Sequence, residues 1–254
     1  MLISLIIVGI IFLVVLAILF KFAKKAFKIV FIASLVLGVV LTILGFFIYQ
    51  DAMELKDQFP VEEKLVLLEH QDQILAGFQG KLNEGEDIIL IDDIQPIQEE
   101  YQQEQLEEIL GSNYKILIIN SQAFENVNTV YLADKDRPRE EIISYLESET
   151  ALDDFIVNYL QESGVPVTEE TKAQALQDMK SQQAIETDDE FKAILFGQLL
   201  QETMEDQGQL FIIFQLKNNN LEIYPETIIF KIIKILPLGI VEDLTKTIQN
   251  GNLQ

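Results

Sequence analysis

Two long apolar runs, separated by a short basic stretch, occupy the first fifty residues and restrict the fold more than any other feature. Residues 1–20 and 29–49 each approach the roughly 20 residues that a helix needs to cross about 30 Å of hydrocarbon. Backbone N–H and C=O groups must be paired inside lipid, so both runs are predicted to be helices. Residues 21–28 are too few for anything but an antiparallel connection. The sequence therefore predicts a transmembrane helical hairpin.

A cleaved signal peptide is the alternative for the first run. It would call for a basic segment before the apolar core, a shorter core and a cleavage site with small residues. Residues 1–20 show none of these, and the residue that follows them is Lys21. The pattern favours two spans.

Lysine predicts the orientation of this hairpin. Four lysines crowd the connector at positions 21, 24, 25 and 28, and no acidic residue occurs before Asp51. Basic residues near membrane spans favour the cytoplasmic side. We therefore expect a two-pass protein of the cell membrane, with the connector inside and both the N-terminus and the C-terminal domain outside.

Small residues follow one face of the second run. Ser34, Gly38 and Thr42 are spaced four apart, which lets helix backbones approach closely. Packing against the first helix is one interpretation, and a homo-oligomer or protein-partner contact is the other. Neither run contains an ionisable residue, which argues against a proton relay through the hairpin.

The portion outside the membrane is strongly acidic. Residues 51–254 hold 14 Lys and Arg against 41 Asp and Glu, a net charge of −27. Such a domain repels nucleic acid, so no nucleic-acid partner is expected, and it attracts cations or a basic partner. Solubility of an exposed domain is the favoured explanation of this charge. The chain has no cysteine, which excludes disulfides, thiolate metal sites and cysteine nucleophiles.

Hydrophobic periodicity predicts the elements of the first half of this domain. Residues 50–60 form a helix-compatible stalk, and residues 61–254 form the domain. Strands at 64–70 and 74–81 flank a hairpin turn, and a third strand covers 87–91. A helix is expected at 97–110. Two further strands are expected at 114–120 and 129–132.

The second half is predicted to be mostly helical. Helices are expected at 139–146, 151–161, 168–181 and 188–204, the last opened by a capping box between Thr187 and Glu190. A strand at 209–217 is expected to pair with one at 221–224. Pro225 then suits the start of a helix to 236, and a weaker helix is expected at 241–249. The order predicts an α+β domain with a helical insertion.

Motif searching assigns no catalytic, cofactor-binding or metal-binding residue. Ser112 and Lys115 match the Ser-x-x-Lys pattern of penicillin-recognising enzymes, but they are predicted to enter a strand, where the side chains point apart. His70 is the only histidine, which argues against a histidine-based triad and a multi-histidine metal site. It is expected on the surface beside a turn. Substitution of any of these three residues is expected to change little.

Two acidic pairs and one glycine pair are weaker candidates. Asp92 with Asp93, and Asp134 with Asp136, could supply oxygen ligands to calcium, but neither continues with the spacing of a calcium-binding loop. The segment from Gly77 to Gly80 lacks the basic surroundings of a nucleotide loop and is expected to bend or close a strand. We expect no cofactor.

One basic apolar helix is unusual in so acidic a domain. Residues 227–236 contain Lys231 and Lys234 among isoleucine, leucine and phenylalanine. A core helix with two solvated lysines is one interpretation. The other is a helix on the membrane surface whose lysines reach the headgroups.

These features favour a structural or interaction protein of the cell envelope, anchored in the lipid bilayer and presenting an acidic binding domain outside. The alternative is a tethered sensor or enzyme domain that binds a small ligand or cation, or an accessory subunit of a membrane complex. An apolar pocket with convergent carboxylates would favour ligand binding. A continuous exposed apolar patch would favour a partner.

Overall fold

The computed structural model describes residues 34–59, 61–81, 88–183, 185–207, 210–237 and 239–240. The chain divides after Met53 into two compact units, which are considered separately below. The first predicted span at 1–20, the connector at 21–28 and the predicted helix at 241–249 lie outside the described residues.

The first described element is the helix Ser34–Gln58. Its most apolar stretch has a mean hydropathy of 1.9, so by length and composition it can cross a membrane. The Thr42 hydroxyl donates a hydrogen bond to the carbonyl oxygen of Gly38 at 2.8 Å, which satisfies this polar group within the helix. The helix continues past Tyr49 through most of the predicted stalk. Within the described residues it is the single helix that meets this criterion, and the two-helix hairpin stays a prediction.

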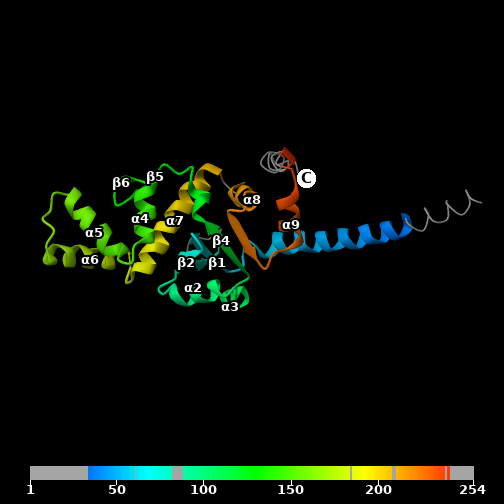
Figure 1. Ribbon diagram of the computed structural model, residues 1–254, viewed down its shortest axis with the longest axis horizontal. Helices are drawn as coiled ribbons and strands as arrows, with labels where there is room; N and C mark the ends of the chain where they lie inside the picture. The colour runs from blue at the N-terminus through cyan, green and yellow to red at the C-terminus, as the bar shows by residue number, and fades with distance from the viewer. Residues whose placement is uncertain are drawn as a thin grey trace, which may run out of the picture. The chain divides into compact units, whose positions relative to one another are not determined.

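The second unit is built on a five-stranded sheet with the order β3-β2-β1-β4-β7 (Figure 1). Strand β1 pairs with β4 in parallel, and every other neighbouring pair in this sheet is antiparallel. The predicted hairpin at 64–81 is confirmed. Its turn residues Gln71 and Asp72 both have positive φ, as two-residue hairpin turns require. The strands are β1 (Lys64–His70), β2 (Gln73–Gly80), β3 (Ile89–Leu90), β4 (Lys115–Asn120) and β7 (Leu221–Tyr224).

Both faces of the sheet are covered, which explains the continuous apolar sequences of β1 and β4. One face packs on α2 (Gln95–Gln102) and α3 (Leu106–Leu110), and alternate strand residues such as Leu67 and Ile118 point to it. The other face, which includes Val66 and Leu117, packs on the helices that follow β4. Figure 1 shows α2 and α3 below the sheet and α7 and α8 above it.

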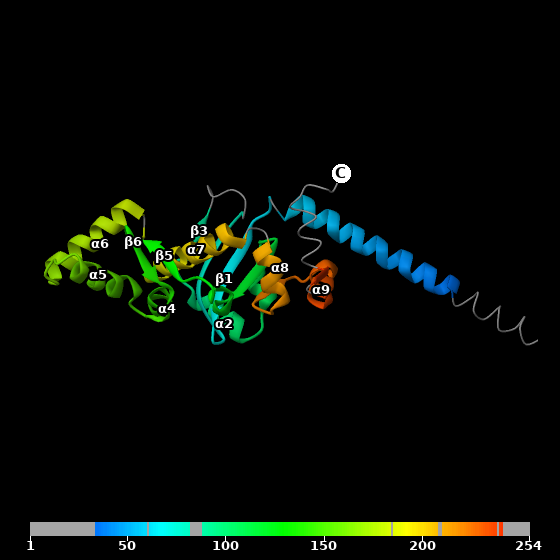
Figure 2. The same cartoon turned by 90° about the horizontal axis from the view of Figure 1, so that it is seen from above.

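The elements on the second face of the sheet are the helical segment that the sequence predicts and a small β-hairpin joined to it. After β4 come the short 3-10 turn Ser121–Phe124 and the two-stranded sheet of β5 (Thr129–Leu132) and β6 (Lys135–Pro138). Both views show α5 and α6 side by side at one end of this domain (Figure 2). The helices are α4 (Arg139–Glu147), α5 (Ala151–Glu162), α6 (Glu169–Gln183), α7 (Asp188–Gln207), α8 (Leu210–Lys217) and α9 (Ile228–Ile235).

The predicted capping box at the start of α7 is confirmed. The Glu190 backbone N–H donates to the Thr187 hydroxyl at 3.1 Å, and the Thr187 N–H donates to the Glu190 carboxylate at 3.0 Å. Two otherwise unpaired N–H groups are therefore satisfied where α7 begins.

The predicted strand at 209–217 is wrong, because residues 210–217 form helix α8. Phe211, Gln215 and Leu216 are buried, a spacing of four and five that fits one helical face. A short apolar run without alternation does not separate strand from helix. Strand β7 consequently pairs with β4 and not with residues 209–217.

Two other helix boundaries also differ from the prediction. The helix expected at 97–110 is two helices, separated where Glu104 takes a positive φ. The apolar positions Tyr101 and Leu106 are five positions apart, which is about 140° around a helix, so one straight helix could not point both side chains at the sheet. The last helix begins at Ile228 and not at Pro225, whose carbonyl oxygen accepts a hydrogen bond from Lys115 at 2.8 Å.

Candidate functional site

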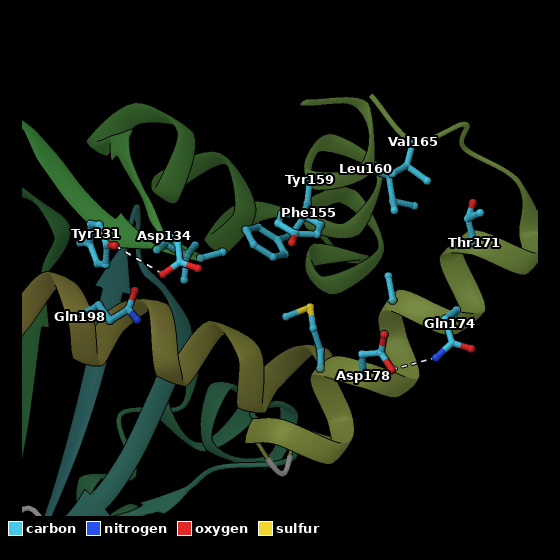
Figure 3. Close-up of a pocket in the computed structure, with 14 residues that line it drawn as sticks. Tyr131, Asp134, Phe155, Tyr159, Leu160, Val165, Thr171, Gln174, Asp178 and Gln198 are labelled. Carbon is cyan, nitrogen blue, oxygen red and sulfur yellow. Dashed lines mark hydrogen bonds between the residues drawn. The ribbon is translucent and has the colours of Figure 1, made fainter. Parts of the chain in front are cut away.

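A cavity of about 630 Å³ lies between the β5–β6 hairpin and helices α5, α6 and α7 (Figure 3). This volume falls in the range typical of small-molecule sites. Figure 3 shows Tyr131 and Asp134 of the hairpin on one side and Gln174 and Asp178 of α6 on the other. The fourteen lining residues are Tyr131, Leu132, Ala133, Asp134, Phe155, Tyr159, Leu160, Val165, Thr171, Gln174, Ala175, Asp178, Met179 and Gln198.

The β5–β6 hairpin carries one wall. Its turn residues Ala133 and Asp134 both have positive φ, which closes a tight two-residue turn. Alternation along β5 buries Val130 and Leu132 and leaves Tyr131 61% exposed. The Tyr131 hydroxyl lies 3.5 Å from the Asp134 carboxylate, at the limit of a hydrogen bond. Both side chains therefore stay available at the cavity edge.

Helix α5 supplies the aromatic part of the lining. Its buried stripe of Leu152, Phe155, Ile156 and Leu160 follows the helical period that the sequence predicts. Tyr159 stacks on Phe155 with ring centroids 6.2 Å apart and an interplanar angle of 20°. Tyr159 keeps 38% of its surface exposed, so an aromatic face is offered to a ligand.

A buried arginine holds this aromatic part in place. The Arg137 guanidinium lies 5.1 Å from the Phe155 ring centroid and is 2% exposed. It pairs with Glu141 of α4 and, at 3.0 Å, with Glu162 of α5. The charge of Arg137 is therefore neutralised by its own partners, and it fixes β6, α4 and α5 to one another.

The polar network continues from Glu141 to Tyr145. The Tyr145 hydroxyl donates to the Glu141 carboxylate at 2.8 Å and accepts from the Asn158 amide at 2.8 Å. Burial, with the neighbouring Glu141, raises the pKa of Tyr145 to about 12. This tyrosine stays neutral at physiological pH and acts as a structural donor behind the cavity.

Helix α6 carries the opposite wall and begins at the predicted Thr168 cap. The Thr171 N–H donates to the Thr168 hydroxyl at 3.2 Å, and Lys172 pairs with Asp153 of α5 at 2.7 Å. These contacts fix α6 against α5. Gln174 donates to the Asp178 carboxylate at 2.8 Å, as the dashed line in Figure 3 marks.

Helix α7 contributes Gln198 to the cavity. The side-chain carbonyl oxygen of Gln198 is buried and has no hydrogen-bond partner within the described structure. A buried acceptor without a donor costs roughly 1–3 kcal/mol. A ligand N–H group would remove that cost.

The charge of the lining is one-sided. Asp134 and Asp178 are carboxylates, and no lysine, arginine or histidine is among the described residues that line the cavity. Together with the Gln198 carbonyl, the site offers acceptors beside an aromatic and aliphatic surface. This chemistry suits a ligand with a positive charge, N–H donors and an apolar body.

A second cavity of about 500 Å³ lies between β2, β3 and α7. Its described lining is mostly apolar, with Met204 at one side and Lys81 as the charged member. It lacks facing carboxylates, so it is a weaker candidate for a specific polar ligand.

His70 lies beside the hairpin turn, as expected, but it is only partly exposed and has two side-chain partners. Its side chain is 22% exposed, and its Nδ1 lies 2.6 Å from the Ser121 hydroxyl, while its Nε2 lies 2.8 Å from the Glu147 carboxylate. One histidine is enough for a Ser–His–carboxylate arrangement, and the parallel ends of β1 and β4 bring these groups together. Ser121 is only 4% exposed, and none of the described cavities is lined by it. The contacts therefore tie α4 to the ends of strands β1 and β4, in the middle of the sheet.

Lys115 is also not a surface residue. It is 2% exposed, and its ammonium lies 4.8 Å from the Tyr114 ring centroid. Its neighbour in the parallel register, Lys64, is completely buried, and burial lowers the pKa of Lys64. Substitution of Lys115 is therefore expected to affect folding, contrary to the sequence-based expectation. Ser112 lies in the turn before β4, three residues away along the chain.

The two acidic pairs lie in different surroundings. A carboxylate oxygen of Asp93 accepts from the Gln95 N–H at 3.1 Å, close to the start of α2. Asp134 lines the cavity, whereas Asp136 does not. In the parts of the chain that the structure describes, no three His, Cys, Asp or Glu side chains converge as a metal site. Gly77 lies inside β2, where an added Cβ would be 2.6 Å from Leu67.

Sequence patterns missed most of the cavity residues. Tyr159 belongs to the predicted α5 stripe, but nothing marked it as less buried than its neighbours. Asp178 and Gln198 lie on helices whose polar residues show no distinctive spacing. Arg137 lies on β6 and Glu141 on α4, so their separation of four residues is the local signal from which this pair could have been suspected.

The comparisons with known proteins leave the site to be judged by its geometry. No family model, no curated protein and no solved structure matches this chain.

Proposed function

We propose that this chain is a membrane-tethered binding protein whose acidic domain takes up a small amine with an apolar or aromatic body. The observation that carries this proposal is the cavity of Figure 3, with Asp134 and Asp178 on facing walls and Tyr159 between them. The unpaired Gln198 carbonyl adds a third acceptor. A primary ammonium group has three N–H donors and can donate to the carboxylate of either wall.

The net charge of the domain supports the same class of ligand. Residues 51–254 carry −27, and such a field raises the local concentration of cations. An anionic ligand would meet two carboxylates and no described cation in the lining. A basic partner protein would be attracted by the same field, but the cavity volume fits a small molecule.

Localisation is part of the proposal. The helix Ser34–Gln58 supports membrane attachment. The basic connector at 21–28 supports a second span before it, with the domain outside. Topology reporters at Lys24 and Gln254 test this: we expect a cytoplasmic signal from the first and an external signal from the second. A cytoplasmic signal at Gln254 would contradict the external placement.

Ligand binding is tested on the full-length protein in lipid nanodiscs with phenethylamine as the probe. We expect phenethylamine to bind, and 2-phenylethanol and phenylacetate, which share its ring but lack its charge, to bind at least tenfold more weakly. Calorimetric titration measures all three. Equal binding of the alcohol would show that partitioning into apolar surface, and not the carboxylates, accounts for uptake.

Matched variants locate the site. Asp178→Asn and Asp134→Asn are each expected to weaken phenethylamine binding about tenfold, since a hydrogen bond to a charged group is worth about 1.5–3 kcal/mol. Asp136→Asn removes the same charge from the same hairpin outside the cavity, and we expect it to change affinity less than twofold. If Asp136→Asn weakens binding as much as the others, the general field and not the cavity is responsible.

A further inference from the structure

One face of α9 leaves large apolar side chains in water. Ile235 is 80% exposed, Ile228 is 38% exposed, and Ile240 just beyond the helix is 47% exposed. The spacing of Ile228, Lys231 and Ile235 places these three on one side of the helix. The other side is anchored, because Phe230 is buried and Ile233 packs on the core. Helix α9 is thus partly a core helix and partly a surface helix.

This face is also basic, in contrast to the domain around it. Helix α9 contains Lys231 and Lys234 and no acidic residue. Lys234 pairs with Glu226 at 2.5 Å, outside the helix, and the Lys231 side chain is exposed. Within a domain of net charge −27, an anionic surface would repel this lysine-bearing helix less than it repels the acidic helices.

Only a short length of chain separates the apolar run from the residue on which α9 packs. The Phe59 ring packs edge to face on Phe230, with centroids 6.3 Å apart. Phe59 follows Tyr49, the last residue of the apolar run, by ten positions. Ten residues reach about 35 Å when fully extended and about 15 Å as a helix. The residue that contacts α9 is therefore separated from the end of the apolar run by at most about 35 Å of chain.

We infer that the exposed face of α9 lies on the bilayer that holds the chain's own apolar anchor. The isoleucines enter the boundary between headgroups and acyl chains, and Lys231 extends to the lipid phosphates. An eight-residue helix would bind a membrane weakly by itself. Here the anchor supplies a high effective concentration, so a weak contact is enough. The inference rests on the membrane anchor of the proposed function and is independent of the ligand cavity.

The absence of cysteine from the chain makes a direct test possible. Ile235→Cys introduces a single thiol for an environment-sensitive nitrobenzoxadiazole label in the full-length protein. The labelled protein is reconstituted in vesicles of phosphatidylcholine and phosphatidylglycerol, with and without lipids that carry a nitroxide near the headgroup. Tyr131→Cys, at a site 61% exposed on the β5–β6 hairpin, is the matched control.

We expect nitroxide lipids to quench the label at position 235 at least threefold more than the label at 131, and aqueous iodide to show the reverse order. Adding Lys231→Glu to Ile235→Cys should reduce the lipid quenching by about half. Equal iodide quenching at both positions would overturn the inference. So would a label at 235 that neither quencher reaches, because a protein surface would then cover α9. Flotation of the Tyr131→Cys protein with the vesicles reports the anchor separately.

Discussion

The central sheet and the α5–α6 end of the domain use the same kinds of apolar residues for different purposes. On the sheet, residues such as Leu67 and Ile116 are fully buried between two helical covers. Around the cavity, Tyr131, Tyr159 and Val165 keep between 38% and 61% of their surface exposed. Buried apolar area stabilises the fold in proportion to the area removed from water. Partly exposed area beside carboxylates is instead available to a ligand.

The largest expected effect tests the sheet side of this comparison. Phe196 is completely buried and contacts Phe78 and Phe124, with ring centroids 5.4 and 6.1 Å away. Phe196→Ala should lower the free energy of unfolding by about 3–5 kcal/mol, because a core cavity is left behind. Urea unfolding of the full-length protein followed by circular dichroism measures this change. Tyr159→Ala is the control and should lower the free energy of unfolding by less than about 1 kcal/mol. Equal losses in the two variants would contradict the difference drawn between the two regions.

Arg137 tests a buried part of the cavity region. Arg137→Gln leaves Glu141 and Glu162 without their partner, and because both glutamates are partly exposed the expected cost is about 1.5–3 kcal/mol. The same unfolding measurement applies. Lys135→Gln removes the exposed partner of Glu162 and should cost about 0–1 kcal/mol. If the Arg137 variant is as stable as the Lys135 variant, the arginine does not hold the α5 aromatics in place.

Gly77 tests how tightly the sheet is packed, in comparison with Gly197 on α7. An added Cβ would lie 2.6 Å from the Leu67 side chain, and Leu67 is completely buried. Gly77→Ala should therefore destabilise the protein by about 1–3 kcal/mol through overpacking. Gly197 on α7 has open space around it, and Gly197→Ala should stabilise the helix by up to about 1 kcal/mol. Opposite signs of the two shifts in the urea midpoint are the expected result.

The smallest effect is a pH dependence at Glu162. The hydrogen bond from Lys135, together with the Arg137 guanidinium, lowers the pKa of Glu162 below its usual value. A carboxyl with a lowered pKa in the folded state contributes stability above its unfolded pKa of about 4.3, and this is lost as pH falls through the folded pKa. The free energy of unfolding of the wild type should therefore exceed that of Glu162→Gln above about pH 5, and the difference should disappear by about pH 3. Glu140→Gln, at a site 79% exposed, should show no such convergence.

Sequence patterns predicted the parts of the fold that depend on local periodicity. Strand β4 was predictable because its apolar run is β-branched and bounded by turn residues. The α7 capping box was predictable because both partners lie within four residues. Local periodicity gave the wrong result for residues 210–217, because a short apolar run fits a strand as well as a helix. Packing on Phe124 and its neighbours makes this segment helical.

Most of the candidate site could not be predicted from the sequence. Its carboxylates are 44 positions apart, at Asp134 and Asp178, and only the packing of α6 against α5 makes them face one cavity. The His70 contacts depend on Ser121 and Glu147, which lie 51 and 77 positions away. Contacts of this kind follow from the parallel β1–β4 pairing, which a single sequence does not specify.

Methyl NMR tests the central claim, ligand binding in the cavity, most directly. The chain has four methionines, of which Met179 lines this cavity, Met204 lines the second one and Met53 lies on the N-terminal helix. The full-length protein, labelled at the methionine methyl groups, is titrated with phenethylamine in nanodiscs. The account predicts a saturable shift of the Met179 signal, absent in Asp178→Asn, with Met53 and Met204 unchanged. A shift of Met204 without Met179, or equal shifts in the variant, would contradict it.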